Sequence, residues 1–228
     1  MPLPQMIRWG ILGIGRFGRL HAQAVRSTYG LELAAICNRN RERLEEAQAE
    51  ISAPLALTDF HELLDDPSID AVSITTHWQD HYEVAAAALA SGKHVLLEKP
   101  MAATSDECRR LVDLSRSSQG KFMVGHICRF DPRVTLAKQA IDAGRIGRIV
   151  SMHAKRNLPQ ARGSLRLDKT SPLMGDGIHD ADLMMWFLGR APTRVYGRHV
   201  RFNEFRYPDV GWAMLEFEDT AIGVIETN

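Results

Sequence analysis

Short apolar runs alternate with amphipathic, polar-faced segments along the first half of the chain. Strands are predicted at residues 7–12, 31–38, 69–75, 94–97 and 121–125, and helices at 19–26, 41–50, 82–90 and 105–117. Apolar strands that alternate with helices are typical of a parallel sheet covered on both faces. We therefore predict a doubly wound α/β domain over residues 1–125. Such a sheet binds its ligand at the carboxyl ends of the strands.

The pattern changes after residue 125. Helices are predicted at 134–143 and 172–188, strands at 147–156, 193–201, 211–217 and 222–227, and a polar, arginine-rich loop at 159–170. Ser171 is placed to cap the second helix, with Pro172 at its first position and Gly189 after its end. Its apolar stripe is expected to consist of Met174, Ile178, Ala181, Met185 and Leu188. Residues 126–228 are thus predicted to form an α+β domain with an open, mainly antiparallel sheet.

A glycine-rich turn joins the first predicted strand to the first helix, as a dinucleotide fingerprint requires. Gly13 permits the tight turn, Gly15 lets the backbone approach a pyrophosphate, and Gly18 lets the helix pack against the strand. The helix start offers N–H groups and partial positive charge to phosphates. The alternative is a glycine turn that serves packing alone.

Composition narrows the classes of protein. The 228 residues carry a formal net charge of +0, which gives no basic excess for nucleic acid. The apolar N-terminal run is too short to cross a bilayer and lacks the features of a secretory signal. Three cysteines, Cys37, Cys108 and Cys128, do not suggest a disulfide framework. A cytoplasmic location is expected, because its reducing conditions keep such thiols free.

Glu98-Lys99-Pro100 follows a buried strand at the ligand edge of the sheet. A partly desolvated lysine there can share its proton near neutral pH and polarise a substrate oxygen. The alternative is a surface salt bridge between Glu98 and Lys99. Pro100 fixes the turn, and we expect its peptide bond to be cis.

The segment Gly175-Asp176-Gly177-Ile178-His179-Asp180-Ala181-Asp182 opens the second helix of the C-terminal half. Asp176 and Asp182 each stand three residues from His179, so on a helix both flank it. A carboxylate beside a histidine suits a general acid/base. Two glycines in a helix cost about 1 kcal/mol each, which favours a close approach by a ligand or another backbone. The alternative is that the aspartates only cap and solvate the helix.

Five motifs occur in order: the glycine turn, Gly92-Lys93-His94-Val95 after an Ala-rich helix, Glu98-Lys99-Pro100, Arg129-Phe130-Asp131-Pro132, and the Gly-Ile-His-Asp-x-Asp helix. Together they resemble the glucose–fructose oxidoreductase / inositol dehydrogenase / rhizopine-catabolism (Gfo/Idh/MocA) family of NAD(P)-dependent oxidoreductases. The resemblance covers essentially the whole chain. It implies a Rossmann domain followed by an α+β domain whose sheet often makes oligomer contacts.

The resemblance also implies roles for particular residues. Lys99 and His179 match the family's catalytic lysine and histidine, and Asp176 is expected to tune the histidine. Thr75, Thr76 and His81 match the segment that lines the nicotinamide. The residues expected to bind the cofactor are Gly13, Ile14, Gly15, Arg16, Phe17, Gly18, Asn38, Arg39, Thr75, Thr76, His77, His81, Glu98, Lys99 and Arg129. The substrate is expected to meet Lys99, Arg156, Asp176 and His179.

Three departures from the family pattern matter. The family often carries an aspartate four residues before the histidine, where this chain has Gly175. His77 stands where a proline is common. Family members are usually longer, so the substrate domain is expected to lack its final strands and helix and to leave an exposed sheet edge.

The choice between NAD and NADP depends on the end of the second strand. Asn38 replaces the acid that would repel a 2′-phosphate, and the guanidinium of Arg39 can meet a phosphate bidentately. Arg41 and Arg43 add positive charge. These residues favour NADP slightly over NAD. The alternatives are that Arg39 stacks on the adenine or that the arginines form a solvated helix start.

Two further patterns carry weaker signals. His77 and His81 stand four residues apart, but no third ligand is evident and no metal site is predicted. Lys155, Arg156, Arg162 and Arg166 could bind a hydroxyl-rich or anionic substrate, or form a solvated face.

The sequence therefore predicts an NAD(P)-dependent enzyme that transfers a hydride between nicotinamide and a hydroxyl or carbonyl carbon of a sugar, cyclitol or polyol. The expected partners are a small-molecule substrate and further copies of the chain, joined through the C-terminal sheet. One rival is a reductase of a non-sugar carbonyl or a dihydrodiol. Another is a non-catalytic dinucleotide sensor or scaffold, which would need the glycines but not Lys99 and His179.

Overall fold

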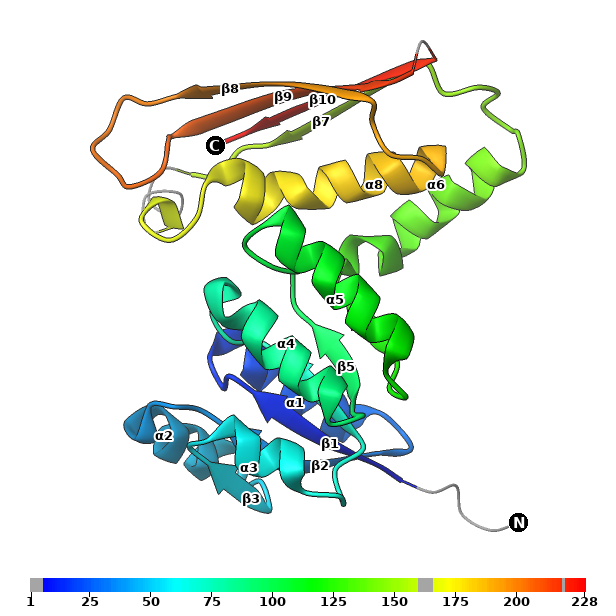
Figure 1. Cartoon of the computed structure of the whole chain (residues 1–228). Coiled ribbons are helices and arrows are strands. Elements are labelled where there is room, and N and C mark those ends of the chain that lie inside the picture. Colours follow the sequence, from blue (N-terminus) through cyan, green and yellow to red (C-terminus); the bar gives the residue numbers. More distant parts are fainter. Residues whose placement is uncertain (1–5, 160–165, 219) are drawn as a thin grey trace. The chain divides into compact units, whose positions relative to one another are not determined.

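The computed structural model describes residues 6–159, 166–218 and 220–228. The chain divides into two compact units, residues 1–125 and 126–228 (Figure 1). Arg162 and half of the loop predicted at 159–170 lie outside the described residues.

The first unit is built on a six-stranded sheet in the order β3-β2-β1-β4-β5-β6. Its strands are β1 (Ile7–Leu12), β2 (Leu31–Cys37), β3 (Leu55–Leu57), β4 (Ala71–Ile74), β5 (His94–Leu97) and β6 (Phe122–Val124). All five pairings are parallel. The strand order reverses between β1 and β4, so the predicted doubly wound α/β fold is confirmed.

Helices cover both faces of this sheet. They are α1 (Arg16–Ser27), α2 (Arg41–Ile51), α3 (Phe60–Asp65), α4 (His81–Ala90) and α5 (Ser105–Ser117), with a 3₁₀ turn η1 (Trp78–Asp80) before α4. Adjacent residues of β1 serve opposite faces: Ile11 packs with α1 and α2, whereas Leu12 packs with α3, α4 and α5. A strand buried on both faces must be apolar throughout, which explains the unbroken apolar runs.

Strand β3 and helix α3 were not predicted. Leu55 and Ala56 of β3 are exposed, and a three-residue strand is too short to show any period. The other elements of this unit agree with prediction to within a few residues. Helix α5 is fixed by a reciprocal capping box between Thr104 and Glu107, and α4 is followed by Gly92 at φ +73°.

The second unit carries a four-stranded mixed sheet in the order β7-β10-β9-β8. Its elements are η2 (Ile127–Phe130), α6 (Pro132–Asp142), β7 (Ser151–Arg156), η3 (Leu173–Gly177), α8 (Ile178–Leu188), β8 (Arg194–Val200), β9 (Val210–Phe217) and β10 (Ala221–Thr227). Strand β10 pairs parallel with β7 and antiparallel with β9, which pairs antiparallel with β8. The predicted mainly antiparallel sheet is confirmed. Strand β7 begins four residues later than predicted.

The helix predicted at 172–188 is divided. Its first part, η3, is a π-helical turn, and α8 follows directly. Helix α8 lies along one face of the sheet (Figure 1), where Met184 packs with Leu215, Phe217 and Ile225. Ala181, Met185 and Leu188 of the predicted stripe join this core, but Met174 and Ile178 do not. A π turn takes more residues per turn than an α-helix, so it changes which side chains face the sheet.

No helix among the described residues is long and apolar enough to span a bilayer.

Candidate functional site

The glycine turn between β1 and α1 has the geometry predicted for two of its glycines. Gly13 has φ +92°, and a Cβ there would lie 2.6 Å from the backbone N of Thr76. A Cβ at Gly18 would lie 2.2 Å from the carbonyl O of Gly13. The tight turn and the close helix–strand packing are therefore confirmed. Gly15 differs, because nothing lies within 4 Å of its Cβ position.

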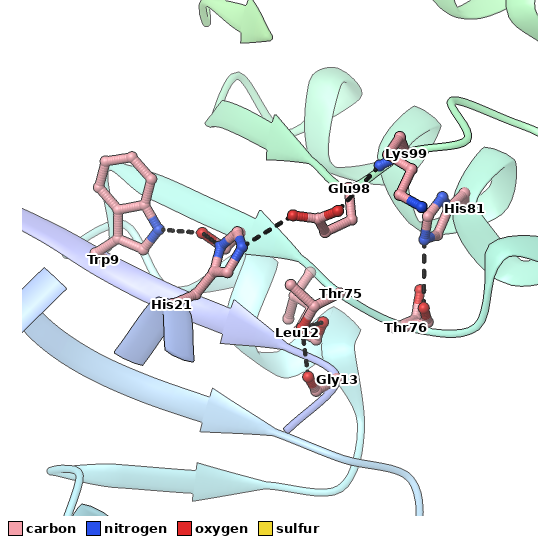
Figure 2. Close-up of polar contacts among 10 residues, drawn as sticks. Trp9, Leu12, Gly13, His21, Thr75, Thr76, His81, Glu98 and Lys99 are labelled. Carbon is pink, nitrogen blue, oxygen red and sulfur yellow. Dashed lines mark hydrogen bonds and ion pairs between the residues drawn. The ribbon is translucent and has the colours of Figure 1, made fainter. Parts of the chain in front are cut away.

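The start of α1 leaves its backbone donors open to a ligand. Gly15 is the N-cap residue and provides no side-chain cap. The first N–H groups of an uncapped helix seek an external acceptor, and an anion at this place also meets the positive end of the helix dipole. The turn is held by Thr75, whose hydroxyl donates to the carbonyl of Gly13 (Figure 2).

The segment after β4 adds a second feature that fits a nucleotide. Thr76 Oγ1 is buried and has no hydrogen-bond partner within the described part of the chain. A buried polar atom without a partner is costly, and a bound ligand can satisfy it. An open Gly15, an uncapped helix start and this hydroxyl together fit a dinucleotide.

His81 is almost fully buried, at 1% exposure. Its Nδ1 lies 2.7 Å from the carbonyl O of Pro100 and its Nε2 lies 3.3 Å from that of Thr76. Burial lowers the pKa of His81, although both carbonyls favour its protonation. The ring thus connects the loop after β4 to the turn after β5. His77 is exposed, and its ring contacts the side-chain oxygen of Gln79.

The end of β2 carries Asn38 and Arg39. Asn38 Oδ1 accepts a hydrogen bond from the backbone N of Asn40. The Arg39 side chain is 82% exposed, and its Nη1 lies 3.3 Å from a carboxylate oxygen of Asp80. Its charge is therefore accessible and only partly compensated.

Lys99 stands at the carboxyl end of β5, in a turn with a cis Lys99-Pro100 bond, as predicted. The Glu98 carboxylate beside it is buried, at 8% exposure. One oxygen lies 3.1 Å from His21 Nε2, and the other accepts from the Lys99 backbone N–H at 3.3 Å. His21 was not predicted from the sequence. A feature of the sequence that could have indicated a polar partner is Ser73, a polar residue inside an apolar strand, which contacts His21.

In the second unit, each aspartate near His179 is paired with an arginine. Asp176 accepts from Arg166 at 2.8 Å, and Asp180 accepts from Arg156 Nε at 2.8 and 2.9 Å. Asp182 accepts from Arg129 at 2.6 and 2.8 Å and lies 3.6 Å from His126. The two aspartates predicted to flank His179, and Asp180 between them, therefore engage guanidinium groups from three other segments.

These pairs define the surroundings of two residues expected to bind ligands. Hydrogen bonds to Asp182 raise the pKa of Arg129, which also lies over the Trp186 ring. Burial raises the pKa of Asp180, although Arg156 opposes that effect. Arg129 and Arg156 each hold a buried carboxylate of α8 within their own unit.

The two glycines of the π turn are approached closely, as predicted. A Cβ at Gly177 would lie 3.4 Å from Ile225 of β10. A Cβ at Gly175 would lie 3.0 Å from the Thr170 methyl and 3.3 Å from Arg166 Nη2. Arg166 thus stands beside the position where the family often carries an aspartate. Lys155 belongs, with Arg156 and Arg166, to the cations that could bind a substrate, and it pairs with Glu226 at 2.8 Å.

The fold and the glycine turn define a class: a Rossmann-type dinucleotide-binding protein with a second, α+β unit. Residues 7–126 match the model of the oxidoreductase family with an NAD-binding Rossmann fold, and residues 134–228 match the Gfo/Idh/MocA C-terminal domain. The chain belongs to the Gfo/Idh/MocA family of oxidoreductases, and the resemblance found in the sequence is confirmed.

Several similar proteins act on cyclitols by name. The chain is 32% identical to inositol 2-dehydrogenase 2 of Saccharopolyspora erythraea over 96% of its own length, and spans 62% of that protein. It is 30% identical to the NAD(+)-dependent scyllo-inositol 2-dehydrogenase of Bacillus subtilis, over 99% of this chain and 68% of that one. A crystal structure of apo scyllo-inositol dehydrogenase from Lactobacillus casei superposes with a TM-score of 0.90 at 26% identity, covering 100% of this chain and 69% of the other.

Proposed function

We propose that this chain is a nicotinamide-dependent oxidoreductase that acts on a hydroxyl or carbonyl carbon of a sugar, cyclitol or polyol. The observation that carries the proposal is the combination, in one unit, of the open glycine turn and Lys99 at the carboxyl ends of parallel strands. That edge is where doubly wound sheets bind their ligands. The names of the similar proteins support the substrate class.

The dinucleotide would supply the group that accepts or donates the hydride. Residues 13–18 would hold its pyrophosphate, Asn38 and Arg39 its adenosine ribose, and the remaining cofactor residues its nicotinamide half. That last set is Thr75, Thr76, His77, His81, Glu98, Lys99 and Arg129. For His81 the support is indirect, because its ring is buried and acts on the carbonyls of Thr76 and Pro100.

In the reaction, Lys99 would polarise the substrate oxygen and His179 would exchange the hydroxyl proton. Asp176 would influence the histidine through its charge, which Arg166 partly compensates. Arg156 would contact the substrate through the part of its side chain that remains exposed beside Asp180. Residues 1–125 would thus form the dinucleotide-binding domain and residues 126–228 the substrate and oligomerisation domain.

The first test is Lys99→Ala. We expect turnover of a polyol such as myo-inositol to fall by about 10²-fold or more, because general acid–base and polarising groups contribute on that order. NADH affinity, followed by nicotinamide fluorescence, should stay within about threefold. Lys121→Ala, at an exposed position before β6, is the matched control. Substantial residual turnover in Lys99→Ala would contradict the role of Lys99.

For the cofactor, we infer acceptance of both dinucleotides with a small preference for NADP. Asn38 presents no carboxylate to a 2′-phosphate, and Arg39 is accessible to one. Arg39→Ala should weaken NADPH binding by about tenfold, the loss of one charge-assisted contact, and leave NADH binding nearly unchanged. Equal loss for both dinucleotides would indicate that Arg39 stacks on the adenine instead.

A second candidate is a dinucleotide-binding protein without turnover. It is favoured by one observation: both aspartates expected to flank His179 are paired with arginines. Saturable NADH or NADPH binding without turnover across a panel of sugars and polyols would support this candidate.

We also propose that copies of the chain associate through the second sheet. Three cross-strand rows of side chains lie on the face opposite α8: Arg194–Glu216–Ile222–Ser151, Tyr196–Met214–Val224–His153 and Arg198–Trp212–Glu226–Lys155. Tyr196 is 62% exposed and Trp212 41%. The flanking charges are already paired, as Lys155–Glu226 and Arg194–Glu216. A second copy could therefore cover the middle row without burying an unpaired charge from these ion pairs.

For the compartment, we propose the cytoplasm. All three cysteines are free, which suits a reducing environment. Burial raises the pKa of Cys37 to about 12, so this thiol is unreactive at neutral pH.

A further inference from the structure

A series of polar contacts leads from Trp9 through His21 and Glu98 to the turn that carries Lys99 (Figure 2). Trp9 Nε1 lies 2.9 Å from Ser73 Oγ, which lies 3.0 Å from His21 Nδ1. His21 Nε2 lies 3.1 Å from Glu98 Oε1, and Glu98 Oε2 accepts from the Lys99 backbone N–H. These contacts connect β1 and α1 with β4 and the end of β5, which lie about 50 to 80 residues further along the sequence.

For a neutral His21 ring beside an ionised Glu98, the donors and acceptors of these contacts are consistent in only one direction. The Trp9 indole can only donate, so Ser73 accepts from it. The Ser73 hydroxyl then donates to His21 Nδ1, and His21 Nε2–H donates to the Glu98 carboxylate. This order fixes the tautomer of His21, with its proton on Nε2 and directed at Glu98.

Glu98 has little freedom to move within this arrangement. A Cβ at Gly125 would lie 3.2 Å from Glu98 Oε1, so the end of β6 also packs against the carboxylate. On the other side of Lys99, the His81 ring holds the carbonyl of Pro100 at 2.7 Å. The residues before and after Lys99 are therefore each held by a histidine.

We propose that His21 is a positioning residue for Lys99: through its Nε2–H it holds the Glu98 carboxylate, which in turn fixes the main chain and the charge beside the lysine. The proposal rests on the proposed function for its catalytic meaning, but the contact from His21 to Lys99 is testable without turnover. Ser73 and Trp9 support His21 from its other nitrogen.

Two substitutions separate the contacts of His21. The amide nitrogen of Gln reaches the place of Nε2, so His21→Gln keeps a donor to Glu98. The shorter Asn reaches only the place of Nδ1, so His21→Asn keeps a contact to Ser73 and loses the one to Glu98. His61→Asn, at an exposed position on α3, is the matched control. If His21→Asn does not fold, His21→Met fills a similar volume without a donor and replaces it.

Each full-length variant is reductively methylated with ¹³C-formaldehyde, and the dimethyl-lysine resonance of Lys99 is assigned by its loss in Lys99→Arg. The kcat and KM for myo-inositol and the Kd for NADH are measured on unmethylated protein. We expect His21→Asn to move the Lys99 resonance and lower kcat by about tenfold or more, since small misplacements of catalytic groups cost up to about 10²-fold. KM and Kd should change by less than about threefold, and His21→Gln should restore both resonance and kcat.

An unmoved Lys99 resonance in His21→Asn, or a His21→Gln variant that behaves like His21→Asn, overturns the proposal. Failure of the proposed function has a different signature, because the wild-type chain would then turn over no polyol. In that case the resonances of the Asn and Gln variants still support or overturn the contact from His21 to Lys99.

Discussion

Three glycines of one turn meet three different surroundings. Gly13 needs a positive φ, Gly18 is packed against backbone, and Gly15 faces open space. Only the first two are required by the fold. For the third, we propose a ligand as the reason, since nothing in the described protein lies within 4 Å of the place of its side chain. Single-residue substitutions can therefore separate the folding requirement of this turn from its binding requirement.

We expect Gly15→Ala to leave the melting temperature within about 2 °C of the wild type, because the added methyl meets no protein atom and surface changes are usually within about 0.5 kcal/mol. NADH binding should weaken by about tenfold or more, because the methyl occupies the approach to the pyrophosphate.

Gly18→Ala is the matched substitution, and we expect it to affect the stability of the fold more than the binding of NADH. Its methyl would overlap the Gly13 carbonyl, so the free energy of unfolding should fall by about 1–3 kcal/mol, the usual cost of overpacking. Thermal unfolding and nicotinamide fluorescence measure both variants. Normal NADH affinity in Gly15→Ala would mean that this glycine has no binding role.

At the same scale, the sequence predicted the roles of residues with local causes. The sequence around a residue was enough to predict the turn at Gly13, the close packing at Gly18 and the cis bond before Pro100. Each depends on the backbone conformation that a glycine or a proline allows. His21 and Lys93 could not be found in this way. The Lys93 side chain is buried because its amine donates to the carbonyls of Asp66 and Ile69, which only the folded chain brings near it.

At the scale of elements, the connection between β8 and β9 depends on one carboxylate. Asp209 accepts from the backbone N–H groups of Phe202 and Asn203 and from the Asn203 side chain. Burial by itself raises the pKa of Asp209, but these hydrogen bonds outweigh it, and the pKa lies below its ordinary value. The ionised carboxylate is thus the form that closes this connection.

We expect Asp209→Asn to lower the free energy of unfolding by roughly 1–3 kcal/mol at pH 7, because the new amide cannot accept all three bonds. A carboxyl with a lowered pKa in the folded state stabilises above its unfolded pKa, near 4, and loses that contribution as pH falls through the folded value. The difference from the wild type should therefore shrink between pH 4 and pH 2. Urea unfolding across this range is the measurement, and a difference that does not depend on pH would contradict it.

Elements with strong local signals were predicted well, and the others were not. The bounds of α5 match prediction because its cap lies within the sequence of the helix start. The π turn at residues 173–177 has no capping residues that would predict a break in the helix. Its glycines, Gly175 and Gly177, instead allow Arg166 and β10 to approach closely. The aspartates pair with arginines 10 to 53 residues away in sequence, and helical periodicity, which relates only residues three or four apart, could not predict these pairs.

At the scale of the whole molecule, the sequence was sufficient for the class of each unit. Alternating apolar runs specify a parallel sheet, and the change of pattern after Gly125 marks the second unit. The face of the second sheet opposite α8 was harder to predict, because the sequences of its strands alternate only partly between apolar and polar residues. Its middle row, with Tyr196 and Met214, becomes visible only once the register is known.

If that face joins copies of the chain, Met214→Glu should convert the oligomer to a monomer. The substitution places unpaired charges at the centre of the buried row, and desolvating them costs several kcal/mol. Light scattering after size-exclusion chromatography measures the mass. Gln119→Glu, at an exposed position of the first unit, is the control. An unchanged mass for Met214→Glu would assign any oligomer to another surface.

The three arginine–aspartate pairs around His179 have a consequence for the electric field of the second unit. Arg129, Arg156 and Arg166 bring three positive charges, and Asp182, Asp180 and Asp176 cancel them at contact distance. Seen from beyond a Debye length of about 8–10 Å, these six residues are neutral. They therefore do not steer an anionic nucleotide toward the histidine. In the first unit, the start of α1 has no side-chain cap and no acidic residue in its first turn, so we propose that its partial positive charge supplies the attraction for the dinucleotide.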